Sequence, residues 1–277
     1  MRGYADPLRV SLQLGLYIFF YILILTFFAI SGLATVLGLF AGSALGVFIA
    51  GVTTNILTLR IYEGRKLADI GFHWNPTSAH NLAWGLAGGM ASAFAVLAGP
   101  LVVRAATLQP GGEQAHWRTF VWVVVMLIFG AAGEEVLFRG YGFQVVLRSV
   151  GPLGAILPVG VLFGLLHAFN PHPSVVGVVN TAGFGILFGY AFLRSRDLWL
   201  PFGLHFGWNF TLPLFGANVS GIRIGVTGYE MHWNGGNLWS GGDYGPEASV
   251  LCTGVLLALF AFIWKAPIRP PRSGPIS

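Results

Sequence analysis

A long charge-free stretch limits what this chain can fold into. Between Arg9 and Arg60 the sequence contains no Asp, Glu, Lys or Arg. Because one helix crosses a bilayer with ~20 apolar residues, a stretch of about 50 predicts two spanning helices, near 11–31 and 35–58. Ser31 and Gly32, with the small residues that follow, mark the reversal between them. A cleaved signal peptide would have a shorter apolar core, so that interpretation is rejected.

The composition of the whole chain supports a membrane protein. Of its 277 residues, 9% are charged and 55% are hydrophobic, whereas an ordinary soluble domain has roughly 25% charged residues. Soluble globular and disordered classes are therefore excluded. Nucleic-acid binding is excluded as well, because the 15 Lys and Arg residues are scattered and form no basic face. Cys252 is the single cysteine, which excludes an internal disulfide framework and a cysteine-based zinc site.

Further apolar runs complete the predicted fold, an all-α polytopic transmembrane helix bundle of about eight spans. The remaining spans are expected near 82–103, from Thr119 onward, and near 152–168, 175–193, 199–215 and 248–264. We expect one transmembrane domain over residues 1–277, without a soluble domain. Residues 266–277 form a short, basic, Pro-rich tail that we expect to be disordered.

The distribution of basic residues predicts the orientation, with both termini in the cytoplasm. In this arrangement Arg104, Arg118 and Arg223 lie outside, together with the Gly-rich segment 217–247, which we expect along the membrane interface. The remaining basic residues then lie inside: Arg2, Arg9, Arg60, Arg65, Lys66, Arg139, Arg148, Arg194, Arg196, Lys265, Arg269 and Arg272.

Four ionisable residues lie within the apolar runs: Glu134, Glu135, His167 and His205. A charge at the centre of a bilayer costs about 2.5–3.5 kcal/mol on insertion scales, whereas a Leu contributes only about 0.5 kcal/mol. These side chains are therefore expected to face the bundle interior or a water-filled cavity, where they have polar partners.

The spacing of these residues suggests their partners. Glu135 and Arg139 stand at i and i+4 with the acid first, which favours a helical ion pair that acts as a structural clamp. Glu134 points about 100° away around the same helix and has no local partner, so it is available for chemistry. His205 and Asn209 are also at i and i+4, and they project to one side of their span.

Helix length provides a check on depth. If the fourth span ended at Arg139, Glu134 would lie only ~7 Å from the inner boundary, and His167 would lie ~22 Å deep in its own span. We therefore expect the fourth helix to continue to about Leu147, which puts Glu134 at ~20 Å. On the same count His205 remains shallower.

Three segments together resemble a known family. Residues 133–139 (GEEVLFR) contain the pattern EExxxR, residues 163–167 (FGLLH) the pattern FxxxH, and residues 205–209 (HFGWN) the pattern HxxxN. Their order on successive apolar segments resembles the CPBP intramembrane proteases, also called the CAAX-protease and bacteriocin-processing (Abi) family, which includes the Rce prenyl-protein endopeptidases. The motif core spans about residues 119–215.

The resemblance implies an intramembrane endopeptidase whose principal carboxylate is Glu134. By similarity, Glu135, His167, His205 and Asn209 complete the catalytic site, and Arg139 supports it. The sequence has no GxSxG pattern, and Ser43 has no histidine or carboxylate near it in the sequence, so a serine nucleophile is disfavoured. The residue types suit direct attack by water, with Glu134 as base, alone or with His167, and His205 and Asn209 as oxyanion donors.

The cofactor remains open at this point. Glu134, His167 and His205 are also a possible Zn²⁺ ligand set of two histidines and one carboxylate. No HExxH motif is present, and the same residues can work without a metal.

Other functions remain as alternatives. Intramembrane Glu and His residues also build proton relays, so one alternative is a proton-coupled transporter. Another is a non-catalytic membrane scaffold or immunity protein. For the protease we expect a membrane-associated or lipidated peptide or protein substrate, and we expect the protein in a bacterial inner membrane as a multi-pass protein.

Overall fold

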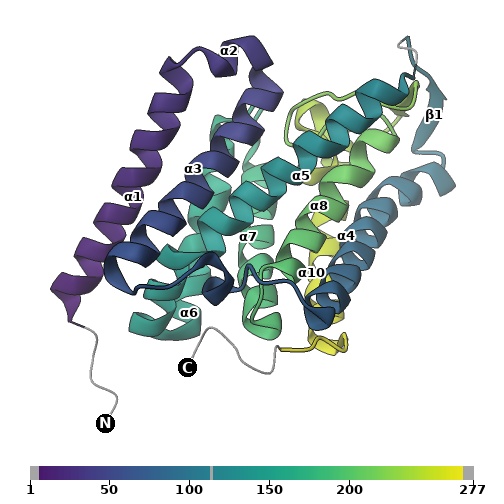
Figure 1. Ribbon diagram of the computed structural model, residues 1–277. Helices are drawn as coiled ribbons and strands as arrows, with labels where there is room; N and C mark the ends of the chain where they lie inside the picture. Colours follow the sequence, from purple (N-terminus) through teal and green to yellow (C-terminus); the bar gives the residue numbers. More distant parts are fainter. Residues whose placement is uncertain (1–5, 113–114, 271–277) are drawn as a thin grey trace.

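The computed structural model describes residues 6–112 and 115–270, and these form a bundle of helices with one small sheet (Figure 1). The short helices are α2 (Leu33–Leu37) and α9 (Asn237–Ser240), and single 3-10 turns connect several elements. The long helices are α1 (Pro7–Ile30), α3 (Leu39–Tyr62), α4 (Pro76–Val102), α5 (Trp117–Arg139), α6 (Tyr141–Leu166), α7 (Val175–Ser195), α8 (Trp199–Leu214) and α10 (Val250–Lys265).

Each predicted span overlaps one of these long helices, but fewer segments have the dimensions of a span. By length and hydropathy, five segments of the described chain could cross a membrane: α1, α3, α4, the stretch Trp117–Phe169 and α7. The fourth of these contains both α5 and α6. Helices α8 and α10 have 16 residues each, which is shorter than a typical span. The structure therefore supports a helical membrane bundle, and the number of about eight spans stays a prediction.

The reversal between the first two spans occurs where the sequence places it. Gly32 has φ 77°, a left-handed conformation that favours glycine, and it ends the first helix before the short helix α2. At the other end of α1, the Asp6 carboxylate accepts a hydrogen bond from the Leu8 backbone N–H, and Pro7 occupies the first helical position.

The predicted extension of the fourth helix to about Leu147 is wrong. Helix α5 ends at Arg139, and α6 begins two residues later. The Asn55 side chain of α3 stabilises this break, because its amide donates to the Val136 carbonyl (3.0 Å) and its oxygen accepts from the Tyr141 N–H (2.6 Å). A Cβ at Gly140 would lie 2.2 Å from that oxygen, so the junction has no room for a side chain.

The depths predicted for Glu134 and His167 assume straight helices that run along the membrane normal, and the helices of this bundle are tilted and bent. Figure 1 shows α5 crossing the bundle obliquely. Helix α6 is not straight either, since Gly151 adopts φ 80° inside it and Pro152 follows. The predicted fifth span thus corresponds to the second part of a bent helix, and Glu134 and His167 meet without a longer α5.

Helices α4 and α8 make the closest contact in the bundle, and glycine residues make it possible. A Cβ at Gly89 of α4 would lie 2.2 Å from the Leu204 carbonyl oxygen of α8, and one at Gly85 would lie 2.5 Å from that of Leu200. Small residues spaced by four positions let helix backbones approach closely in membranes. This glycine contact fixes the position of α8, the helix that carries His205, against α4.

The two loops at one end of the bundle join in a small sheet that the sequence analysis did not predict. Strand β1 (Ala106–Pro110) pairs antiparallel with β2 (Tyr229–Trp233), with Leu108 opposite Met231. The segment 217–247, expected along the interface, therefore pairs in part with the loop between α4 and α5. Both loops were predicted on the same side of the membrane, as this pairing requires.

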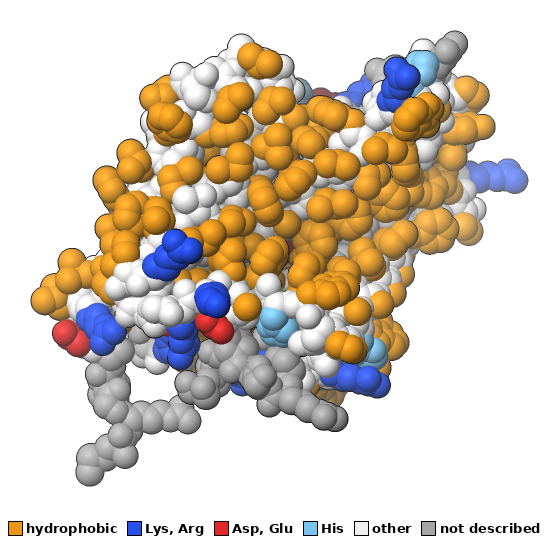
Figure 2. Space-filling view, in the orientation of Figure 1, with side chains coloured by type: hydrophobic (Ala, Val, Ile, Leu, Met, Phe, Trp, Pro, Cys, Tyr) orange, Lys and Arg blue, Asp and Glu red, His pale blue; other side chains and the backbone are white. Residues whose placement is uncertain are grey.

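The face of the bundle seen in Figure 2 is apolar over most of its height. Large hydrophobic side chains are exposed on several helices, among them Phe27, Leu153 and Leu257. Apolar patches of this extent are rare on soluble monomers and suit contact with lipid. Together with the apolar helices, this surface identifies an integral membrane protein.

The first residues of the basic tail are ordered against the bundle, contrary to expectation. Asn81 of α4 donates to the Arg269 carbonyl and accepts from the Arg269 N–H, at 2.8 and 3.1 Å. A ring nitrogen of His80 lies 2.9 Å from the Pro267 carbonyl. The rest of the predicted tail, residues 271–277, lies outside the described residues, as does Arg2.

Candidate active site

Glu134 and Glu135 follow one another on α5 but lie in different environments. The side chain of Glu134 is 27% exposed and lines a cavity, whereas that of Glu135 is only 1% exposed. Glu135 lies 3.3 Å from Arg139, as the i, i+4 spacing predicts. The two acids therefore divide into one that can reach a ligand and one that has protein partners.

Arg139 is buried inside the bundle, so its assignment to the basic residues of the cytoplasmic side is wrong. Its side chain is fully buried, and it donates to the Gly185 carbonyl of α7 at 2.8 Å. Its guanidinium lies 5.1 Å from the ring centroid of Phe163 and 5.3 Å from that of Phe188. The Glu135 carboxylate compensates the buried charge, which explains why an arginine is tolerated here.

His205 of α8 connects the two acids. Its Nδ1 lies 2.9 Å from Glu135 Oε1, and its ring stacks on Phe188 at 5.1 Å between centroids. Because the Glu135 carboxylate accepts from Nδ1, the Nε2 atom is free to face Glu134, and it lies 3.8 Å from Glu134 Oε2.

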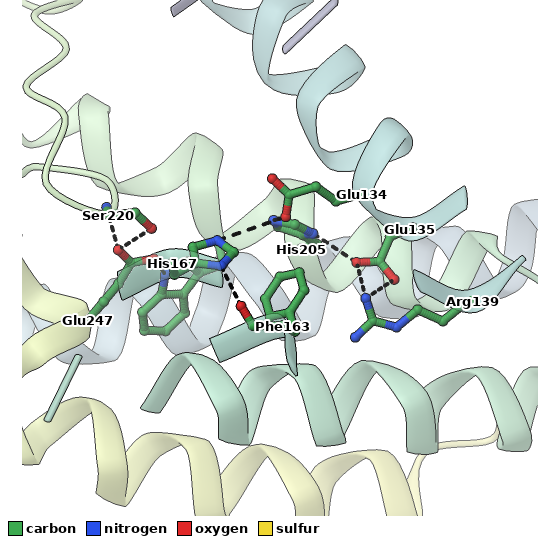
Figure 3. Close-up of polar contacts among 9 residues, drawn as sticks. Glu134, Glu135, Arg139, Phe163, His167, His205, Ser220 and Glu247 are labelled. Carbon is green, nitrogen blue, oxygen red and sulfur yellow. Dashed lines mark hydrogen bonds and ion pairs between the residues drawn. The ribbon is translucent and has the colours of Figure 1, made fainter. Parts of the chain in front are cut away.

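His167 reaches the same oxygen from the end of α6. Its Nδ1 donates to the Phe163 carbonyl one turn earlier, at 2.8 Å, and its Nε2 lies 4.0 Å from Glu134 Oε2. The FxxxH spacing thus pairs the histidine with the backbone carbonyl of its phenylalanine. Figure 3 shows both imidazoles turned toward Glu134, with Glu135 and Arg139 beyond His205.

Three atoms therefore converge at the site: Glu134 Oε2 and the two histidine Nε2 atoms. Among the described residues, Glu134 Oε2 has no hydrogen-bond partner. Distances of 3.8 and 4.0 Å from this oxygen are too long for direct hydrogen bonds. They leave room for one water oxygen at hydrogen-bond distance from Glu134 and a histidine.

Glu134 Oε2 lies too far from the two histidine nitrogens for the three atoms to bind one zinc ion. Tetrahedral Zn²⁺ binds nitrogen and oxygen ligands at about 2.0–2.1 Å, which places ligand atoms about 3.4 Å apart. Within the described part of the chain, no three His, Cys, Asp or Glu side chains are grouped so that they could hold a metal ion. As arranged, these residues do not fit a metal centre, and no chemical step is assigned to one.

The site lies on the wall of a cavity of about 440 Å³. Most of the wall is apolar, from helices α1, α3, α5, α6, α7 and α8, and Asn209 lines it one turn after His205. Ser43 of α3 also lines it. In the described part of the chain, no hydrogen bond joins this hydroxyl to a histidine or a carboxylate.

Glu247 also lines the cavity, and sequence reasoning missed it. Its carboxylate accepts from Trp208 Nε1 at 3.1 Å and from the Ser220 backbone N–H and hydroxyl. It lies on the opposite side of His167 from Glu134 (Figure 3). Burial raises the pKa of the Glu247 carboxyl. Its hydrogen bonds with Ser220 and the electrostatic effect of the nearby His167 partly oppose this increase. Glu247 directly precedes the predicted span 248–264 and resembles an ordinary loop residue, so no pattern in the sequence singles it out. His172, five residues after His167, does not line the cavity.

Comparison with known proteins supports the resemblance seen in the motifs. Residues 115–211 match a family model described as Type II CAAX prenyl endopeptidase Rce1-like. The matched region contains all three motifs, so the recognised family resemblance is confirmed. The chain is also 26% identical over 135 residues to the "Uncharacterized protein YyaK" of Bacillus subtilis (strain 168). That alignment covers 46% of this chain and 45% of the relative, so the chain matches less than half of the relative's length.

Proposed function

We propose that this protein is an intramembrane endopeptidase that hydrolyses a peptide bond with a water molecule activated by Glu134. The observation that carries the proposal is the convergence of Glu134, His167 and His205, from three separate helices, on one side of a cavity large enough for a peptide segment. The match to an endopeptidase family over the same residues supports this interpretation.

In this mechanism, Glu134 accepts a proton from water as the water oxygen bonds to the substrate carbonyl carbon. His167, which already donates through Nδ1, uses Nε2 to orient the same water. His205 Nε2 and the Asn209 amide donate hydrogen bonds to the developing oxyanion. When the C–N bond breaks, Glu134 returns the proton to the leaving amine, so that protons and charge balance over the cycle.

Glu135 and Arg139 act through His205 in this proposal. The Glu135 carboxylate holds His205 Nδ1 at 2.9 Å, which fixes the tautomer and directs Nε2 toward the cavity. Arg139 in turn holds Glu135 and the Gly185 carbonyl. Both are positioning residues, since neither is exposed to the cavity.

The proposal is tested by comparing membranes from cells that carry the wild type or Glu134→Gln. Removing the base is expected to reduce proteolysis by at least about 100-fold, the lower range for general base catalysis. The readout is the set of new peptide N-termini found by proteomics. Asp243→Asn is the matched control, because it neutralises an exposed carboxylate that does not line the cavity. Unchanged cleavage by Glu134→Gln would exclude the proposed base, whereas pH-gradient-driven flux without cleavage would favour a transporter.

A second measurement addresses metal dependence. Since the three converging atoms do not fit a metal centre, we expect the purified protein to keep its activity after chelation. Loss of activity on chelation, with recovery after Zn²⁺ is returned, would show that the site closes around a metal.

A further inference from the structure

The catalytic cavity is lined by loop residues from only one end of the bundle. We call the end where α1 begins and α10 ends the terminal end, and the end that carries the β1–β2 sheet the distal end (Figure 1). Among the described residues that line the cavity, several belong to distal loops, namely Asn170, Val219, Ser220, Ile222, Ile224 and Glu247. None belongs to the terminal-end loops 63–75, 196–198 or 266–270.

Toward the terminal end, a layer of buried polar side chains closes the cavity. Glu135, Arg139 and Gln144 are each at most 1% exposed. Gln144 Nε2 donates to the Ile70 carbonyl (2.9 Å) and to that of Arg139 (3.1 Å), which joins the loop before α4 to the end of α5. A separate, apolar cavity of about 300 Å³ lies on that side, lined in part by Phe72, Leu198 and Glu135, and it shares no lining residue with the catalytic cavity.

The basic residues distinguish the two ends of the bundle. Of the described Lys and Arg residues other than the buried Arg139, the distal end has three, Arg104, Arg118 and Arg223. The terminal end has nine: Arg9, Arg60, Arg65, Lys66, Arg148, Arg194, Arg196, Lys265 and Arg269. In Figure 2, charged side chains gather along the lower edge, which is the terminal end. Because Lys and Arg are enriched in cytoplasmic loops, the distal end faces away from the cytoplasm.

The cavity walls also restrict what can enter. Tyr21 and Leu25 of α1 border the cavity on one flank and Leu166 of α6 on another, and Leu166 is 46% exposed on the lipid-facing surface. These apolar side chains suit a peptide segment with apolar residues. Glu247 is the only described acid that a distal loop contributes to the wall.

We propose that substrate reaches Glu134 from the extracytoplasmic side. The substrate class is an apolar peptide segment at the outer face of the membrane, such as the outer end of a membrane anchor or a secreted peptide. This inference rests on the proposed function for the cleavage, but the direction of access can be measured without cleavage.

Access is tested by cysteine labelling in spheroplasts of cells that express the full chain. Cys252→Ala removes the single, buried cysteine. In that background, Gln109→Cys reports on the distal end, Lys66→Cys on the terminal end, and Ser43→Cys on the cavity wall. We expect a membrane-impermeant maleimide to label Gln109→Cys and Ser43→Cys in intact spheroplasts. Lys66→Cys should react at least about 10-fold more after permeabilisation.

The reverse pattern, with Lys66→Cys reactive and Gln109→Cys protected in intact spheroplasts, would overturn the orientation. If Gln109→Cys reacts but Ser43→Cys requires permeabilisation, the proposal that the cavity opens at the distal end is wrong. The same labelling is repeated with Glu134→Gln, which should not change it. A protein that is labelled as expected but cleaves nothing would therefore contradict the proposed function and leave the direction of access intact.

A cleavage assay completes the test. An impermeant, quenched fluorogenic peptide with apolar residues around its scissile bond is added to right-side-out or inside-out vesicles that contain equal amounts of protein. We expect cleavage in right-side-out vesicles at least about 10-fold above that in inside-out vesicles. Equal cleavage in both, or more in inside-out vesicles, would refute extracytoplasmic access.

Discussion

Each histidine at the site has one ring nitrogen committed to a partner, and this determines what the other nitrogen can do. The Phe163 carbonyl can only accept, so His167 Nδ1 carries a proton, and its Nε2 remains for a reactant. His205 is fixed in the same way by a carboxylate. The side chains that hold the rings therefore matter as much as the rings themselves.

At this scale, the two adjacent acids should respond differently to substitution. Glu135→Gln leaves the Arg139 charge buried without compensation, which is expected to cost about 3–5 kcal/mol of stability and to abolish cleavage. Glu134→Gln should abolish cleavage with little change in stability, since its side chain is partly exposed to the cavity and has no close partner. Thermal unfolding in detergent measures the difference. Equal stability of the two variants would show that the buried pair has no clamping role.

Glu247 should make stability depend on pH. Burial raises the pKa of its carboxyl in the folded protein above the unfolded value. The folded protein therefore binds this proton more tightly than the unfolded chain does. The resulting stabilisation is complete below the unfolded pKa and is lost as the pH rises through the folded pKa. As the pH rises through this range, we expect the Tm of the wild type to fall relative to the Tm of Glu247→Gln. Asp243→Asn should keep the wild-type dependence, and parallel profiles for all three proteins would contradict the prediction.

Among the elements, α8 depends most on close packing, since it carries His205 and Asn209 and packs against the glycines of α4. Gly89→Ala would place a methyl group 2.2 Å from the Leu204 carbonyl oxygen, so α8 must move. Overpacking of this kind costs about 1–3 kcal/mol, and displacement of His205 should reduce cleavage at least about 10-fold. Gly99→Ala on the same helix is the control, because nothing lies within 4 Å of its added Cβ. Cleavage rates and Tm of the two variants provide the comparison, and similar values would argue against a positioning role for the glycine contact.

The sequence predicts the elements better than the junctions between them. Apolar runs located each long helix, and the i, i+4 spacing predicted the Glu135–Arg139 pair. The break after Arg139 could not be predicted, because it depends on Asn55, which is 86 residues from the Tyr141 N–H that it binds. The β1–β2 sheet was missed because its strands have five residues each and lie in loops.

For the molecule as a whole, the motifs predicted which polar side chains meet, whereas the wall around them required the structure. Glu134, His167 and His205 come together from three helices, as expected of ionisable groups that cannot face lipid. Glu247 joins them through a distal loop, and a single sequence contains no signal for such a contact. The depth of each side chain could not be predicted for a related reason. It depends on the tilt and the bends of the helices, and neither is visible in hydropathy.

The closed layer below the site has a consequence for any cell that carries this protein. A carboxylate and two imidazoles within a bilayer could pass protons from one to the next if water reached them from both faces. Here the buried Arg139, Glu135 and Gln144 separate them from the terminal end, and the fixed positive charge of Arg139 repels a migrating proton. We therefore expect the chain to hold a hydrated pocket in an energised membrane without dissipating the gradient across it.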